Sequence, residues 1–138
     1  ILIGLFAVLL VACGGKTQKN NAQATGTEAK EQVADASVVN VYYFHGKQRC
    51  KTCIAVGDVT EKTIKELYTD NPYVKFIEVK TDEEQNASLV EKYEVTWNAL
   101  IVSKGDNSID ITDKAFANAL NSPENLTNLI KTEVDKRL

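Results

Sequence analysis

The sequence predicts one α/β domain with the element order β-α-β-α-β-β-α, a central sheet and helices on both faces. A β-prone run from Ser37 to Phe44 is typical of a central strand buried on both faces. Apolar residues then recur at helical spacing from Cys53 to about Asp70. Further along, two strands separated by a short polar turn predict a hairpin. The longer connections between the earlier strands predict parallel pairing.

The first predicted strand and helix flank a short polar loop, residues 45–49. Tyr42 and Phe44 of the strand are expected in the core. The Asn71-Pro72 pair ends the helix. The inward-facing positions of this helix are predicted to be Val56, Thr60, Ile64, Leu67 and Tyr68.

Residues 74–79 are predicted to form the second strand. Thr81 is expected to cap the next helix, because Glu84 three residues later completes a capping box. This helix is expected to turn three apolar side chains inward, namely Leu89, Val90 and Tyr93.

The last part of the chain predicts a hairpin followed by helices. Its strands are residues 99–102 and 108–112, joined by a polar turn. A short helix or turn follows at 113–120, and Ser122-Pro123 opens the final helix. Its buried stripe is predicted to be Leu126, Leu129, Ile130 and Val134. This order of elements is that of the core of the thioredoxin fold.

Two segments precede the domain, which is predicted to span residues 36–138. Residues 1–12 are apolar and uncharged but too short to span a bilayer, so they predict part of a signal peptide. The run ends in Leu-Val-Ala-Cys13, which resembles the lipobox of bacterial lipoproteins. Cys13 is then the lipid anchor and 13–35 a flexible tether. The alternative is an ordinary secretory signal with a chance cysteine. We expect an extracytoplasmic, membrane-anchored lipoprotein, at the periplasmic face or cell surface.

Charge and cysteine content narrow the function. The net charge is −3 and acidic and basic residues are interspersed. The sequence therefore has no basic stripe of the kind that binds nucleic acid, and this class of function is set aside. With Cys13 joined to lipid, the remaining cysteines are Cys50 and Cys53, two residues apart. In an oxidising compartment, these two thiols are able to form a disulfide.

The Cys-x-x-Cys unit lies between a predicted strand and helix. Free N–H groups at a helix start favour a nearby negative charge, so Cys50 is predicted to be the attacking thiolate. Cys53, one turn further, is predicted to be the resolving thiol. Arg49 adds a positive charge beside Cys50, unless it is a plain surface charge. His45 either assists Cys50 or is solvated at the strand end.

Two other interpretations of the motif remain open. The pair forms a static disulfide that braces the helix start, or it forms half of a zinc site. Zinc takes four ligands, and the nearby sequence offers only Cys50, Cys53 and His45.

The stretch VYYFHGKQRCKTC resembles small thioredoxin-like proteins of arsenic-resistance operons, named as nitrophenyl-compound nitroreductase subunits. The Ser-Pro-Glu that opens the last helix, residues 122–124, is a second shared feature. The resemblance covers Val39 to the C-terminus. It implies reduction of nitroaromatic or aromatic-arsenical compounds together with a partner subunit and an efflux permease.

The sequence departs from thioredoxin itself at two places. Phe44 occupies the position of a buried acid that commonly accepts a proton from the inner thiol. The Thr-Pro pair before the third strand, whose proline is usually cis, is matched here by Thr96-Trp97. Loss of that proline makes soft-metal or arsenic binding easier. Trp97 either covers the dithiol or packs at the strand start.

Thiol–disulfide exchange is the leading hypothesis, with electrons passing between this dithiol and a partner redox protein or reductase subunit. No cofactor is expected beyond the Cys50–Cys53 disulfide, because no glycine-rich phosphate loop is present. The first alternative is a non-catalytic module that binds a soft metal or trivalent arsenical on Cys50 and Cys53. The second is an adaptor whose disulfide only braces the fold.

Overall fold

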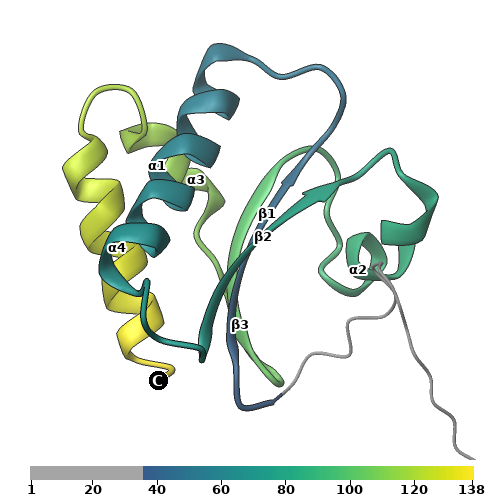
Figure 1. Cartoon of the computed structure of the whole chain (residues 1–138). Coiled ribbons are helices and arrows are strands. Elements are labelled where there is room, and N and C mark those ends of the chain that lie inside the picture. Colours follow the sequence, from purple (N-terminus) through teal and green to yellow (C-terminus); the bar gives the residue numbers. More distant parts are fainter. Residues whose placement is uncertain (1–35) are drawn as a thin grey trace, which may run out of the picture.

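The structure is a computed structural model that describes residues 36–138 (Figure 1). The predicted signal peptide, the anchor Cys13 and the tether lie outside the described residues. The elements are β1 (Val39–His45), α1 (Lys51–Leu67), β2 (Val74–Lys80), η1 (Glu84–Asn86), α2 (Ala87–Lys92), β3 (Ala99–Lys104), β4 (Asn107–Asp110), α3 (Thr112–Asn118) and α4 (Pro123–Asp135).

The four strands form one sheet in the order β2-β1-β3-β4. β1 pairs with β2 in parallel, whereas β1 with β3 and β3 with β4 are antiparallel. This confirms the predicted β-α-β-α-β-β-α order, the parallel pairing of β1 with β2 and the β3–β4 hairpin. The expected parallel pairing of the third strand is wrong. Val79 near the end of β2 and Ala99 at the start of β3 both lie beside Phe44, so the connection between them returns to the same end of the sheet and β3 runs antiparallel to β1. The central position of β1 brings its end, and the loop that leads into α1, beside the start of β3.

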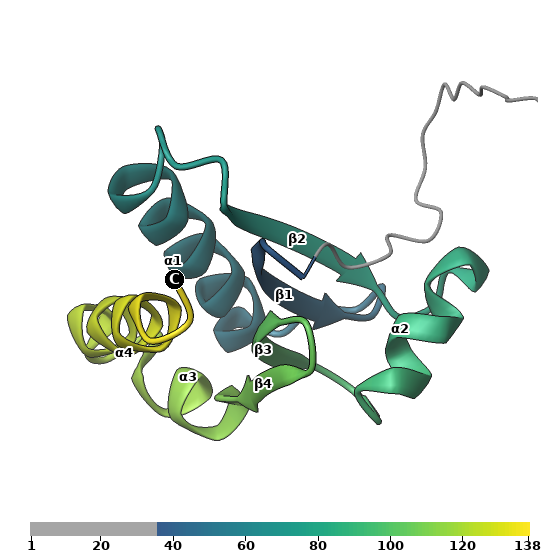
Figure 2. The same cartoon turned by 90° about the horizontal axis from the view of Figure 1, so that it is seen from below.

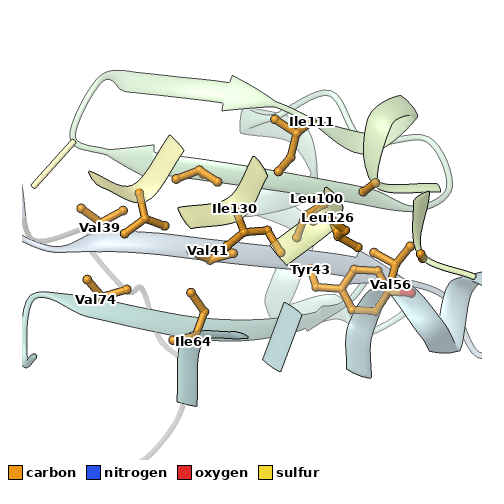
Figure 3. Packing of buried hydrophobic residues seen from close by; sticks show 14 residues of the cluster. Val39, Val41, Tyr43, Val56, Ile64, Val74, Leu100, Ile111, Leu126 and Ile130 are labelled. Atoms are coloured by element: carbon orange, nitrogen blue, oxygen red, sulfur yellow. The ribbon is translucent and has the colours of Figure 1, made fainter. Parts of the chain in front are cut away.

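Helices cover both faces of the sheet, as predicted. α1, α3 and α4 lie on one face and α2 on the other (Figures 1 and 2). Side chains alternate along a strand, so β1 contributes to two cores. Val39, Val41 and Tyr43 join the larger cluster beneath α1 and α4 (Figure 3). Tyr42 and Phe44 join the smaller cluster beneath α2. Both predicted core aromatics are therefore confirmed.

The predicted capping box at Thr81 is wrong. The backbone N–H of Thr81 donates to the carbonyl of His45 at 2.8 Å, which extends the β1–β2 pairing past the strand end. Glu84 opens a 3-10 turn instead, and α2 begins only at Ala87 without a side-chain cap. Leu89, Val90 and Tyr93 still pack against the sheet as predicted.

Two further details differ from the predicted helices. Leu67 was expected to face inward, but it is the last residue of α1 and is 45% exposed. Ser122 precedes α4 and Pro123 is at its first turn, as predicted, yet the Ser122 side chain makes no capping hydrogen bond. Within residues 36–138, no helix combines the length and apolarity needed to cross a membrane.

Candidate functional site

Cys50 and Cys53 form a disulfide at the N-terminus of α1, with their Cα atoms 4.9 Å apart. Cys50 is the N-cap residue, and its Sγ accepts a hydrogen bond from the Cys53 backbone N–H at 3.0 Å. Cys50 is exposed, whereas Cys53 is only 4% exposed. The predicted placement is therefore confirmed, with an outer and an inner sulfur.

Tyr43 of β1 contacts the first turn of α1 from the side of the sheet. Its hydroxyl donates to the carbonyl oxygen of Cys53. Burial raises the pKa of Tyr43, although the neighbouring Arg49 guanidinium opposes that effect, so the phenol remains a neutral donor. Its ring lies near Val56 in the larger core (Figure 3). The position of Cys53 is thus fixed by the sheet as well as by the helix.

Arg49 lies back on the domain rather than projecting into solvent. Its guanidinium carbon is 5.6 Å from the centre of the Tyr43 ring, and Nη1 is 3.7 Å from Glu78 Oε1. The side chain fits because residue 57 is glycine: a Cβ there would lie 2.8 Å from Arg49 Nη2. The interpretation of Arg49 as a plain surface charge is therefore wrong.

His45 ends β1 and is buried, at 4% exposed. Its Nε2 lies 2.7 Å from Glu78 Oε1 and its Nδ1 lies 2.8 Å from the Gly46 carbonyl oxygen. The expectation of a solvated histidine is wrong, because β2 runs beside β1 and brings Glu78 to it. Both ring nitrogens have partners other than the sulfurs, so His45 orders the loop that leads to Cys50.

The residue that contacts the inner sulfur is Asn98, which was not predicted. Its Nδ2 lies 3.7 Å from Cys53 Sγ, and its Oδ1 is buried with no hydrogen-bond partner. β3 begins at Ala99, so Asn98 occupies the last position before the strand. The available signal is its position in the sequence, one residue after Trp97, which matches the proline of the Thr-Pro pair.

Trp97 and Thr96 are both exposed. Trp97 is 79% exposed, so the indole is not packed at the strand start, and little of its surface is left to cover a sulfur. No cis peptide bond occurs among residues 36–138. Of residues 96–98, Asn98 is the one whose side chain forms a hydrogen bond with the dithiol.

The surroundings also bear on proton transfer and metal binding. Phe44 lies in the cluster beneath α2, on the face of the sheet opposite Tyr43. Within residues 36–138, no group of three or more His, Cys, Asp or Glu side chains is arranged to hold a metal ion. Cys50 and Cys53 are joined in the disulfide, and both ring nitrogens of His45 lie against oxygen atoms of Glu78 and Gly46.

Comparison with known proteins leaves the family open. Neither a protein-family model nor a curated protein matches the chain. One solved structure, described as "Structure of a malarial protein", is similar over 70% of this chain and 98% of its own, with 24% sequence identity and a TM-score of 0.47. That similarity indicates no function. The exposed and buried sulfurs of one Cys-x-x-Cys unit are nevertheless compatible with a thiol redox module.

Proposed function

We propose that this protein is an extracytoplasmic thiol–disulfide oxidoreductase, held at a membrane by lipid on Cys13. The observation that carries the proposal is the unequal environment of the two sulfurs. Cys50 is exposed at the N-cap of α1, while Cys53 is buried one turn further on. Cysteines that react with partners lie in accessible, electropositive positions, and buried thiols are protected from outside attack.

The helix start favours the thiolate of the reduced outer cysteine. In the disulfide, Cys50 Sγ already accepts the Cys53 backbone N–H, a donor that α1 leaves free of intrahelical partners. Once reduced, the same N–H faces a negative charge on sulfur, which the helix dipole also stabilises. Arg49 adds positive charge next to Cys50 in the chain, although Glu78 partly neutralises it.

The exchange then proceeds in two balanced steps. The Cys50 thiolate attacks one sulfur of a partner disulfide, so a Cys50–partner disulfide forms and one partner thiolate leaves and takes up a proton. Cys53 gives its proton to solvent and attacks Cys50 Sγ. The mixed disulfide breaks, the second partner sulfur leaves as thiolate, and the Cys50–Cys53 disulfide re-forms. Two electrons have passed to the partner, and a separate reductant must restore the dithiol.

The natural partner is proposed to be another redox protein or reductase subunit. The resemblance of VYYFHGKQRCKTC to arsenic-operon nitroreductase subunits suggests that the electrons serve reduction of nitroaromatic or aromatic-arsenical compounds. The aromatic reduction itself requires an electron carrier such as a flavin on that partner. The role of this chain is then to deliver or receive electrons through Cys50 and Cys53.

A second candidate function is capture of a soft metal or trivalent arsenical on the two thiolates. The exposed Cys50, and the tryptophan rather than a proline at position 97, favour it. A binding module must keep its dithiol reduced to hold the ligand. An exchange protein must instead cycle between the two states.

Single-cysteine variants test the proposal. In a Cys13→Ser background, which removes the third thiol, the protein is expected to speed reduction of a model protein disulfide by dithiothreitol. Cys50→Ser is expected to abolish that activity. Cys53→Ser is expected to retain attack but to accumulate a mixed disulfide visible by mass spectrometry.

The two variants serve as matched controls, because each removes one sulfur and the same disulfide. Equal loss in both, with no mixed disulfide from Cys53→Ser, would contradict the assigned roles. Full activity in both variants would contradict the exchange function, and the disulfide would then serve only to brace the fold.

A further inference from the structure

The amide of Asn98 is placed to interact with the inner cysteine in more than one state of the protein. Its Nδ2 lies 3.7 Å from Cys53 Sγ, and its Oδ1 is inaccessible to solvent and without a partner. Buried polar atoms nearly always have a hydrogen-bond partner, so an orphaned carbonyl beside a redox-active sulfur requires an explanation. The disulfide form supplies no donor to this oxygen, because neither sulfur carries a proton.

We propose that Asn98 is a positioning residue for the resolving thiol: its Nδ2 donates to the Cys53 thiolate, and its Oδ1 accepts the S–H of the reduced, protonated Cys53. This inference rests on the exchange function proposed above and concerns the second step of that reaction. A rotation of the terminal carboxamide presents either the donor or the acceptor to the same sulfur. One side chain therefore serves both protonation states of Cys53.

The need for such a residue follows from burial. Cys53 is 4% exposed, and burial disfavours a charged thiolate unless hydrogen bonds compensate. The neighbouring Tyr43, His45 and Arg49 side chains each have a partner other than the inner sulfur, although Arg49 Nε itself has no hydrogen-bond partner. The Tyr43 hydroxyl donates to the Cys53 carbonyl, and Arg49 and His45 both interact with Glu78.

Among residues 36–138, the side chain that forms a hydrogen bond with the inner sulfur is the uncharged Asn98, whereas the charged groups near the dithiol have other partners. Glu78 on β2 interacts with His45 at the end of β1 and with Arg49 in the loop before α1, while Lys51 is exposed at the start of α1. Asn98 approaches Cys53 from the third element packed there, the segment before β3. An uncharged amide cannot take the proton, so the proton of Cys53 passes to water, and Asn98 stabilises the thiolate that remains.

The same geometry sets a direction for the redox equilibrium. In the disulfide form, the unpartnered Oδ1 of Asn98 raises the free energy of the protein. Reduction gives Cys53 an S–H group that is able to donate to this oxygen. Asn98 therefore favours the reduced protein. Replacing it with an apolar side chain is expected to make the disulfide harder to reduce.

Two-phase reaction with an aromatic disulfide reagent, 5,5′-dithiobis(2-nitrobenzoate), tests the proposal. In the reduced Cys13→Ser protein, attack by Cys50 releases one coloured thiolate, and attack by Cys53 on the mixed disulfide releases the second. Asn98→Leu is expected to slow the second release about tenfold and to move its pH midpoint upward by about one unit. The first release is expected to stay within about twofold, as Asn98 does not contact Cys50.

Asn128→Leu is the matched control, because Asn128 is exposed on α4 and the substitution is the same. Its two phases are expected to match those of the unaltered protein. Asn98→Ala, a smaller change, gives the same comparison if the leucine variant does not fold. The reduction potential of either Asn98 variant is expected to be more negative than that of the parent.

The outcomes separate the two proposals. Two coloured thiolates from the parent and an unchanged second phase in both Asn98 variants would overturn the role of Asn98 alone. One coloured thiolate from the parent, with Cys53 never resolving the mixed disulfide, would overturn the exchange function itself.

Discussion

Two ends of the domain differ in whether their polar side-chain atoms have hydrogen-bond partners. The dithiol end comprises Tyr43, His45, Arg49, Cys50, Cys53 and Asn98, and the α4 end comprises Tyr68, Lys131, Glu133, Asp135, Lys136 and Arg137. Within residues 36–138, the buried side-chain polar atoms without a hydrogen-bond partner are Arg49 Nε and Asn98 Oδ1. Both are at the dithiol end.

At the α4 end, charged groups are paired. Lys136 Nζ and Arg137 Nη1 each donate to the Glu133 carboxylate at 2.9 Å. Tyr68 donates to Asp135 at 2.6 Å, and this links the end of α1 to α4. The hydrogen bond from Lys131 holds the pKa of Asp135 below its usual range, and Tyr68 acts in the same direction.

This difference in hydrogen bonding indicates that the α4 end contributes to stability without a competing requirement. An unpartnered buried polar atom costs about 1 to 3 kcal/mol, so such atoms persist where another requirement keeps them. At the α4 end nothing opposes full pairing. At the dithiol end, the groups must suit an oxidised and a reduced form, and a disulfide offers fewer partners than two thiols.

At the dithiol end, the largest effect on stability is expected from placing a methyl group at position 57, where Arg49 packs against α1. In Gly57→Ala, the new Cβ would lie 2.8 Å from Arg49 Nη2 and 2.9 Å from Tyr43 Cε1. Overpacking of this kind is expected to lower the free energy of unfolding by about 2 kcal/mol. Urea denaturation measures the change.

Gly46→Ala is the control, since its Cβ would meet only Thr81 Oγ1 at 3.7 Å. This variant is expected to remain within about 0.5 kcal/mol of the parent. Equal stability of the two variants would show that the packing of Arg49 between Tyr43 and α1 is not tight.

A smaller effect is expected from breaking the pairing at the α4 end. Glu133→Gln keeps the shape but removes the charge that Lys136 and Arg137 neutralise, and is expected to cost about 1 kcal/mol at pH 7. Chemical denaturation at several pH values measures the effect.

The pH dependence of this effect has a defined sign. The hydrogen bond from Lys136, assisted by Arg137, lowers the pKa of Glu133 in the folded protein below its ordinary value of 4.5. The carboxylate therefore contributes stability above about pH 4.5, and this contribution is lost as the pH falls through the lowered pKa. The parent and Glu133→Gln should converge in stability as the pH falls below the lowered pKa of Glu133. A constant difference between them at all pH values would mean that the charge is not the cause.

The smallest effect is expected at Trp97, which is 79% exposed. Trp97→Ala is expected to change the free energy of unfolding by less than about 0.5 kcal/mol. Leu126→Ala, in the core beneath α4, is the contrasting control and is expected to cost about 2 to 5 kcal/mol. A large loss from Trp97→Ala would instead assign the indole a packing role.

Much of the fold could be predicted because its determinants are local. The β-prone run along Val39–His45, the helical spacing in α1 and the polar turn before β4 each depend on neighbouring residues. The same holds for the disulfide, since residues three apart on a first turn are within bonding range. The capping box failed because strand pairing held Thr81, and that pairing comes from the distant carbonyl of His45.

The surroundings of the dithiol could not be predicted, because they come from segments far apart in the chain. Glu78 on β2 reaches His45 and Arg49 only through the parallel β1–β2 pairing. Asn98 reaches Cys53 across 45 residues. Motif spacing identifies the two sulfurs, but the groups that distinguish them become visible only when the sheet is assembled.

The reduction potential of the Cys50–Cys53 pair tests the central claim most directly. It is measured in the Cys13→Ser protein by equilibration with glutathione or dithiothreitol buffers, with the two states separated by thiol alkylation. A cycling dithiol predicts a value between about −120 and −270 mV, the range of exchange proteins. A value well below about −300 mV would contradict the account, because a disulfide that resists reduction serves to brace the fold.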